Sequence, residues 1–253
     1  MVDFAERLKD LKAMHMANRI RAINMIGPQV EGLTFEGFPT TKENQDALQH
    51  VGAWAAVPDP PKKGLAIFGR PGSGKTGLMV SALRCCAERK DGDAERWVLT
   101  AGGCTDYQVQ RQAEIFGLQH RGQLRRRPAP VCADSWPLLE RRLKMAMRCG
   151  TSHQLGDENP TDIVLQDEID QNVEVYGLDD VTASPASDWK QTILWNIVER
   201  PFRGKRVVLT FATQPDSLRL FVGETLASRI ADARCWKHVV INGSSLRPKV
   251  KAN

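Results

Sequence analysis

The feature that most constrains this chain is an eight-residue run that matches G-x-x-x-x-G-K-[ST] in full, Gly69-Arg70-Pro71-Gly72-Ser73-Gly74-Lys75-Thr76. An apolar run at 64–68 precedes it and has the composition of a strand buried on both faces of a parallel sheet. A helical pattern from 75 to about 89 follows it. The segment therefore predicts a strand, a glycine-rich turn and a helix whose N-terminus is aimed at the turn.

This arrangement is typical of a phosphate-binding site, because glycines let backbone N–H groups turn inward and the helix N-terminus adds positive potential. Lys75 is predicted to contact the β- and γ-phosphates, and the Thr76 hydroxyl to coordinate Mg²⁺. The predicted cofactors are ATP and Mg²⁺. The alternative is a glycine-rich turn with an incidental lysine. The predicted cofactor-binding residues are Gly69, Arg70, Pro71, Gly72, Ser73, Gly74, Lys75, Thr76 and Gly77.

A second metal-positioning carboxylate is expected at the end of a neighbouring strand, and the run Ile-Val-Leu-Gln-Asp-Glu at 163–168 supplies one. Asp167 is predicted to hold Mg²⁺ together with Thr76, and Glu168 to polarise an attacking water, which favours hydrolysis. The alternative is a pair of solvated acids at a strand end. Asp179 and Asp180, with Asp170, lie downstream and are expected in a solvated loop.

Strand-like and helix-like runs alternate along the rest of the chain, which predicts an α/β fold with a doubly wound parallel sheet. Further strands are expected at 97–100, 163–165, 206–211 and 238–241, and helices at 136–148 and 188–199. Apolar spacing predicts an amphipathic helix over residues 4–25. A capping-box sequence, Thr-Thr-Lys-Glu, predicts that the next helix begins at Thr40.

The net charge of +5 is concentrated in one window. Residues 121–148 hold eight basic and two acidic side chains, so this window is +6 and the remainder is −1. A basic stretch of this kind could follow a phosphate backbone with salt-sensitive, sequence-tolerant binding to single- or double-stranded DNA. The alternative is a solvated basic helix face. The DNA-binding candidates are Arg125, Arg126, Arg127, Arg141, Arg142 and Lys144.

Composition excludes several classes of protein. Six cysteines form no CxxC pair, which argues against a disulfide scaffold or a zinc module. No apolar run approaches the roughly 18 residues of a membrane span, and the charged N-terminus lacks the apolar core of a secretory signal. We therefore expect a cytoplasmic protein without a membrane partner.

The order and spacing of the motifs resemble the AAA+ ATPases of the DnaC/IstB-like family, which includes helicase loaders and transposition helpers. The resemblance covers roughly residues 33–249. It rests on GLAIFGRPGSGKTGLMVSAL, IVLQDEID, RVVLTFATQPDSL, LASRI and INGSSLR in this order. It implies a P-loop NTPase three-layer sandwich with an ATPase domain at 33–253, a basic insertion at about 104–130, a reduced or absent lid, and an N-terminal helical extension at 1–32.

The resemblance also implies roles for three residues outside the glycine-rich run. Arg229 corresponds to an arginine finger that reaches the nucleotide of a neighbouring subunit, which implies a ring or spiral homo-oligomer; the alternative is a surface ion pair. Thr213 stands where the family usually has a water-orienting asparagine, and Gln214 could substitute for it. Arg247 corresponds to a second sensor of the phosphates, or is an exposed C-terminal arginine.

The function that follows from the resemblance is ATP-driven loading of a replicative helicase onto single-stranded DNA. Two alternatives stay open. One is a transposition helper that binds duplex DNA and recruits a transposase. The other is a nucleotide-switched binding module with little turnover, which the threonine at position 213 favours. The N-terminal helix would dock on the helicase, join subunits or meet the transposase, or pack on its own ATPase core.

Overall fold

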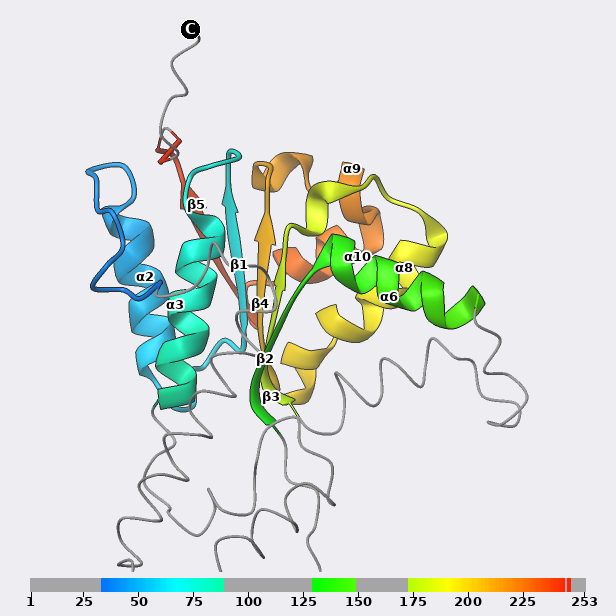
Figure 1. Ribbon diagram of the computed structural model, residues 1–253, viewed down its shortest axis with the longest axis horizontal. Helices are drawn as coiled ribbons and strands as arrows, with labels where there is room; N and C mark the ends of the chain where they lie inside the picture. The colour runs from blue at the N-terminus through cyan, green and yellow to red at the C-terminus, as the bar shows by residue number, and fades with distance from the viewer. Residues whose placement is uncertain (1–32, 89–128, 149–172, 244, 247–253) are drawn as a thin grey trace, which may run out of the picture.

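A computed structural model describes residues 33–88, 129–148, 173–243 and 245–246 (Figure 1). Its helices are α2 (Gln45–Ala56), α3 (Lys75–Glu88), α6 (Trp136–Arg148), α8 (Asp188–Val198), α9 (Arg219–Val222) and α10 (Glu224–Ala231). Its strands are β1 (Gly64–Gly69), β2 (Ala129–Ser135), β3 (Val173–Asp179), β4 (Arg206–Phe211) and β5 (Trp236–Ile241). Short 3-10 turns are η4 (Val181–Ala183), η5 (Arg200–Arg203) and η6 (Pro215–Ser217).

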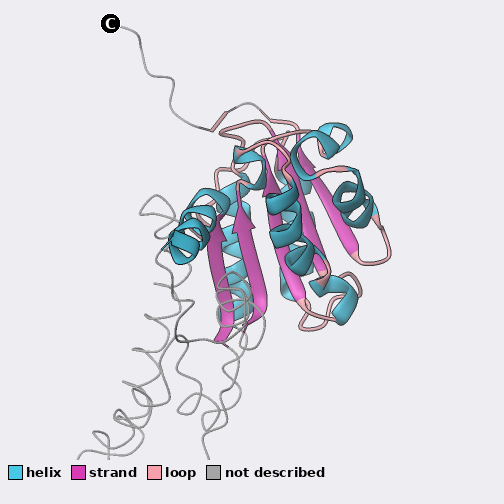
Figure 2. Ribbon diagram, turned by 90° about the vertical axis from the view of Figure 1, so that its right-hand side faces the viewer, coloured by secondary structure: helices cyan, strands magenta, loops and turns pink. Residues whose placement is uncertain are grey.

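The strands form one parallel sheet in the order β2-β3-β4-β1-β5. Helices α2 and α3 cover one face, and α6, α8 and α10 cover the other, so the molecule has three layers (Figures 1 and 2). The strand order places β4 between β1 and β3. Because all strands run in the same direction, the carboxyl ends of β1, β4 and β3 lie side by side at one edge of the sheet.

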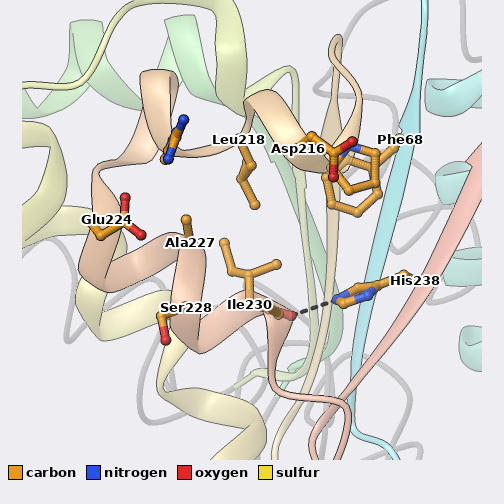
Figure 3. A pocket seen from close by; sticks show the side chains of 11 residues that line it. Phe68, Asp216, Leu218, Glu224, Ala227, Ser228, Ile230 and His238 are labelled. Atoms are coloured by element: carbon orange, nitrogen blue, oxygen red, sulfur yellow. Dashed lines mark hydrogen bonds between the residues drawn. The ribbon is translucent and has the colours of Figure 1, made fainter.

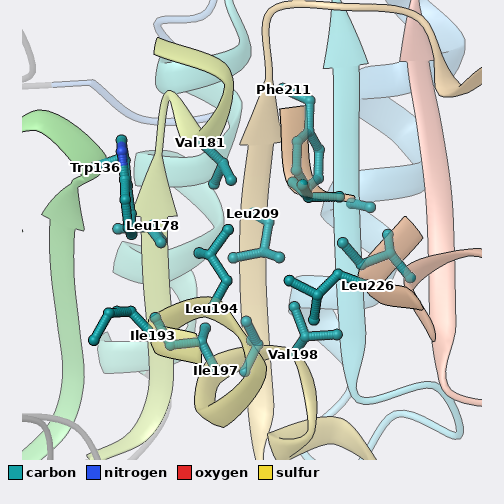
Figure 4. Close-up of a cluster of buried hydrophobic side chains, with 14 of the residues drawn as sticks. Trp136, Leu178, Val181, Ile193, Leu194, Ile197, Val198, Leu209, Phe211 and Leu226 are labelled. Atoms are coloured by element: carbon teal, nitrogen blue, oxygen red, sulfur yellow. The ribbon is translucent and has the colours of Figure 1, made fainter. Parts of the chain in front are cut away.

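Burial on both faces of the sheet explains why the sequences of the central strands are largely apolar. Every residue of β1 and of β4 is buried, as expected for strands covered by helices on both sides. The core facing α8 and α10 is drawn in Figure 4, where Leu194 and Ile197 of α8 lie against Leu209 of β4. A second core on the other face includes Leu78 and Leu83 of α3.

The α/β fold class is confirmed, and the predicted positions of β4 and α6 agree with the structure at both ends. The strands expected at 97–100 and 163–165 lie outside the described residues. Strands β2 and β3 were not predicted. In β3, Gly177 interrupts the apolar run; a side chain there would collide with Leu83 of α3, so the glycine permits the close approach of helix and strand.

The predicted start of α2 at Thr40 is wrong, because the helix begins at Gln45. Asn44 closes a turn instead: its Oδ1 accepts a hydrogen bond from the Thr41 backbone N–H at 2.7 Å, and its Nδ2 donates to the Pro39 carbonyl at 2.8 Å. The Thr40 hydroxyl donates to the Phe38 carbonyl, and it does not adjoin the first helical turn, whose N–H groups it was expected to accept from. These local bonds compete with the first helical turn.

Several sequence predictions fall outside the described part of the chain: the helix at 4–25, the extension at 1–32, nearly all of the insertion at 104–130, and the expectation of a reduced or absent lid. None of the described helices is long and apolar enough to cross a membrane.

Candidate nucleotide-binding site

The glycine-rich turn joins the end of β1 to the start of α3, as predicted. Gly72 and Gly74 adopt φ angles of 82° and 95°, a left-handed region that residues with a side chain rarely adopt. A Cβ at Gly72 would collide with the Ser245 side chain, and one at Gly74 would lie 2.7 Å from the Phe38 ring. The turn therefore requires glycine at both positions, for conformation and for space.

Lys75, the first residue of α3, lies within this turn rather than in solvent. Its exposed fraction is 7%, and its ammonium donates a hydrogen bond to the Arg70 carbonyl at 2.9 Å. The Ser73 hydroxyl is buried and has no hydrogen-bond partner among the described residues. A buried hydroxyl, a lysine curled over the turn and a helix N-terminus together fit a phosphate group.

A carboxylate meets the turn from across the sheet. Asp179 is the last residue of β3, and Thr76 Oγ1 lies 3.1 Å from its Oδ1 and 2.9 Å from its Oδ2. On the intervening strand β4, the Thr210 hydroxyl donates to Asp179 Oδ1 at 2.5 Å and accepts a hydrogen bond from the Asp180 backbone N–H at 2.9 Å. Two threonine hydroxyls thus tie β3 to β4 and to the first turn of α3.

Burial is the main influence on the charge of Asp179, whose side chain is 7% exposed. Burial raises the pKa of this carboxyl, hydrogen bonds from Thr210 and Thr76 lower it, and the neighbouring Asp180 and Lys75 have smaller opposing effects. A hydroxyl beside a buried carboxylate is an all-oxygen donor set that suits Mg²⁺. The residues present therefore fit the metal and nucleotide that the sequence predicts.

Asp179 corrects the sequence analysis, which placed it with Asp180 in a solvated loop. Asp179 ends a buried strand, and Asp180 follows it beside Thr210. The predicted pair, Asp167 and Glu168, lies outside the described residues, so its role stays a prediction. The available signal for the second pair was an acid doublet directly after Leu178, at the end of a run that Gly177 interrupts.

The segment after β3 is tied to the segment after β4. Asp180 has a left-handed φ of 55° and leads into η4. Within η4, the Thr182 hydroxyl accepts a hydrogen bond from the Ala212 N–H at 2.7 Å. The next residue, Thr213, accepts a hydrogen bond from the Gly69 N–H through its carbonyl at 3.2 Å. The structure thus places Thr213 directly beside the glycine-rich turn, and Gln214 follows it as an exposed residue.

The C-terminal segment returns to the same turn. The Leu246 backbone N–H donates a hydrogen bond to the Gly72 carbonyl at 2.9 Å, so residues 245–246 border the site. Arg247 is the next residue and lies outside the described range. Its predicted contact with the phosphates is therefore a proposal that rests on its neighbour.

Arg229 lies on α10 and contacts α8 and η5. Its Nε forms an ion pair with Glu199 at 3.2 Å, and its guanidinium lies 5.6 Å from the Trp195 ring and 5.1 Å from the Phe202 ring. The side chain is 42% exposed. Within one subunit, Arg229 makes the surface ion pair that was the alternative expectation, and its action on a neighbouring nucleotide remains a proposal.

The described basic candidates lie on α6. Arg141 is exposed, and Lys144 is exposed with its ammonium 2.6 Å from Glu140 and 5.5 Å from the Trp189 ring centre. The side chain of Arg142 and the whole of Arg125, Arg126 and Arg127 lie outside the described residues. α6 therefore presents basic side chains, part of whose charge is balanced by Glu140.

A separate pocket of about 360 Å³ lies on the α10 face of the sheet (Figure 3). Phe68, Leu218 and Ile230 line it with Asp216, Glu224 and His238, and His238 Nε2 lies 2.6 Å from the Ile230 carbonyl oxygen. The lining contains no residue of the glycine-rich turn after Phe68. Nothing in the described ranges forms a group of three or more potential metal ligands of the His, Cys, Asp and Glu types.

Comparison with known proteins finds similar folds among solved structures. No family model and no curated protein matches the sequence. Among solved structures, that of the DnaC helicase loader is 18% identical with a TM-score of 0.56, over 85% of this chain and 100% of that one. That of DnaI is also 18% identical, with a TM-score of 0.55 over 85% and 94%. The replication initiator DnaA bound to AMPPCP and single-stranded DNA is 16% identical, with a TM-score of 0.53 over 85% and 50%.

These likenesses show the fold: the chain shares with these structures the three-layer α/β architecture with a parallel sheet, as the resemblance of its motifs implied. At such low sequence identities, a shared fold does not show that this chain has the activity of the similar proteins.

Proposed function

We propose that this protein binds ATP with Mg²⁺, hydrolyses ATP, and acts as an oligomer in loading a replicative helicase onto single-stranded DNA. The observation that carries the nucleotide part is the contact of Thr76 with Asp179, reinforced by Thr210. It brings the hydroxyl of the glycine-rich turn to a buried carboxylate two strands away.

Each residue of the site has a distinct proposed role. The backbone of the glycine-rich turn and Lys75 bind the phosphates, and Thr76 with Asp179 holds Mg²⁺. The metal, when bound, neutralises charge on the phosphate oxygens. Asp180 polarises the attacking water, a role the sequence analysis gave to Glu168. Asp180 is favoured because it follows the metal-binding carboxylate directly and its backbone is fixed by Thr210.

The test compares the two acid pairs by steady-state ATP turnover and by equilibrium ATP binding. Lys75→Ala is expected to abolish both. Asp180→Asn is expected to lower kcat about 100-fold or more with ATP binding retained, because it removes only the water-polarising group. Glu168→Gln is expected to turn over like the wild type. The reverse result, with turnover lost in Glu168→Gln and kept in Asp180→Asn, would return the role to Glu168.

The helicase-loading part rests on likeness to the DnaC helicase loader and on the basic side chains of α6. Single-stranded DNA is the proposed nucleic acid, since the similar DnaA structure contains it. Arg141→Glu is expected to weaken binding and to flatten its salt dependence. A preference for duplex DNA, with capture of a transposase rather than a helicase, would favour a transposition helper.

One observation favours the nucleotide-switched module as a second candidate. Thr213 stands beside the glycine-rich turn and is held there through its carbonyl. Its side chain is shorter than that of the asparagine which the resemblance leads us to expect. Slow turnover in the wild type, with nucleotide-dependent assembly, would support this candidate. Restoration of fast turnover by Thr213→Asn would identify the side chain responsible.

A further inference from the structure

A buried lysine lies behind the acid pair and outside the nucleotide site. Lys190, in the first turn of α8, is 1% exposed. Its ammonium donates hydrogen bonds to the carbonyls of Val181 and Ser184, each at 2.6 Å, and lies 5.2 Å from the Trp136 ring centre. Two carbonyls and an aromatic face therefore surround the charge.

Burying an ammonium group is unfavourable unless its N–H groups are satisfied. Burial lowers the pKa of Lys190 to about 8, and the carboxylates of Glu140 on α6 and Asp180 oppose that shift. The lysine is therefore largely charged at neutral pH, and both carbonyl contacts are charge-assisted. Such contacts are strong enough to fix the backbone they hold.

The backbone they hold is the turn that begins directly after the acid pair. Val181 is the first residue of η4, and Ser184 follows its last residue, so Lys190 bonds both ends of this turn. The turn is linked onward through the Thr182 hydroxyl to the Ala212 N–H, next to Thr213. At its start, Asp180 has a left-handed backbone, which persists only where the surroundings enforce it.

We propose that Lys190 is a positioning residue that fixes η4, and through it the backbone of Asp180 and the segment bearing Thr213. The proposal rests on the proposed role of Asp180 in polarising water. Lys190 does not touch the nucleotide-binding turn, so its effect falls on the rate of the chemical step and not on nucleotide affinity. A shift of a catalytic group by about 1 Å can lower a rate about 100-fold.

Trp136, the first residue of α6, also contacts Ser184, but through the serine hydroxyl instead of the serine carbonyl. Its indole Nε1 donates to the Ser184 hydroxyl at 2.9 Å, whereas Lys190 bonds the Ser184 carbonyl. Ser184→Ala therefore removes the tryptophan contact and keeps the lysine contact. Ser184→Ala is thus the control for a change at the same place in the fold. Lys205→Met is the control for the same chemical change made at an exposed lysine.

The experiment measures kcat, ATP affinity and amide hydrogen exchange in the full chain for Lys190→Met and Lys190→Gln. Lys190→Met should lower kcat about 10- to 100-fold with ATP affinity within twofold of the wild type. Lys190→Gln should recover part of the loss, because its amide still donates. Exchange should quicken at the amide of Ala212, whose acceptor Thr182 lies in η4, and at the amide of Asp180, which directly precedes η4 and bonds Thr210 of β4. It should stay slow in β1 and α3. Lys205→Met and Ser184→Ala should retain at least half of kcat.

Three results would overturn the proposal: a kcat for Lys190→Met within twofold of the wild type, unchanged exchange at Asp180 and Ala212, or faster exchange across the whole domain. The last would show that Lys190 serves only global stability. If the wild type does not hydrolyse ATP, the proposed function fails, and hydrogen exchange alone decides whether Lys190 fixes the turn.

Discussion

At the scale of single residues, Asp179 carries a stability cost in the nucleotide-free fold. It is buried, its carboxylate lies 2.9 Å from the Thr76 hydroxyl, and burial raises its pKa. A raised pKa means that the charged form is less favourable in the folded chain than in the unfolded one. The resulting loss of stability is present above the folded-state pKa and disappears as the pH falls through it.

Asp179→Asn is therefore expected to raise the melting temperature of the nucleotide-free protein at neutral pH, by about 2–4 °C for each ~1 kcal/mol of relieved burial cost. The difference from the wild type should shrink as the pH is lowered towards the raised pKa, where Asp179 takes up a proton. Thermal unfolding in the absence of nucleotide and Mg²⁺, between pH 4 and 7, measures this. A variant that is less stable than the wild type at pH 7 would show that the charge is not costly.

At the scale of elements, the sequence predicted those segments whose apolar runs are largely unbroken. β1 is a continuous apolar run, β4 is apolar except for Arg206 and Thr210, and every residue of both strands is buried. β3 escaped prediction because its glycine at 177 looks like a break, whereas it admits Leu83 of α3. The first turn of α2 was misplaced because Asn44 bonds the preceding loop, a choice between local hydrogen bonds that the capping pattern does not decide.

Gly74, in the glycine-rich turn, and Gly52, within α2, are expected to respond in opposite ways to alanine. Gly74→Ala should abolish ATP binding and destabilise the chain, because Gly74 has a left-handed φ and a side chain would meet Phe38. Gly52→Ala, within α2, meets no atom within 4 Å and should stabilise the chain by about 0.5–1 kcal/mol with ATP binding unchanged. Denaturant unfolding and ATP titration test both; loss of stability in Gly52→Ala would show that α2 is constrained in a way the contacts do not reveal.

At the scale of the whole molecule, the strand order brings the acid of β3 to the turn after β1. The sequence predicted the turn and the sheet, but not that Asp179 would contact the turn, because that depends on strand order rather than on spacing along the chain. The basic window was located by composition, and the structure shows its α6 part packed through Trp136 against Lys190. Arg229, on α10, contacts α8 and η5 and has Glu199 as its ion-pair partner.

An assembly that shares nucleotide sites predicts complementation between defective subunits. Arg229→Ala retains its own phosphate-binding turn but offers no finger, whereas Lys75→Ala offers a finger but binds no ATP. Each alone should be inactive, and a mixture should recover part of the ATPase activity. No recovery, together with an equal defect in Glu199→Ala, would assign Arg229 to the ion pair within its own subunit.

The central claim, that Thr76 and Asp179 form the Mg²⁺ site, is tested most directly by measuring how Mg²⁺ changes ATP affinity in two matched variants. In the wild type and in Asp167→Asn, Mg²⁺ should tighten ATP binding about tenfold or more, because Thr76 and Asp179 would hold a metal that offsets the charge of the phosphates. In Asp179→Asn that gain should vanish while metal-free ATP binding persists. Loss of the gain in Asp167→Asn and its retention in Asp179→Asn would contradict the account.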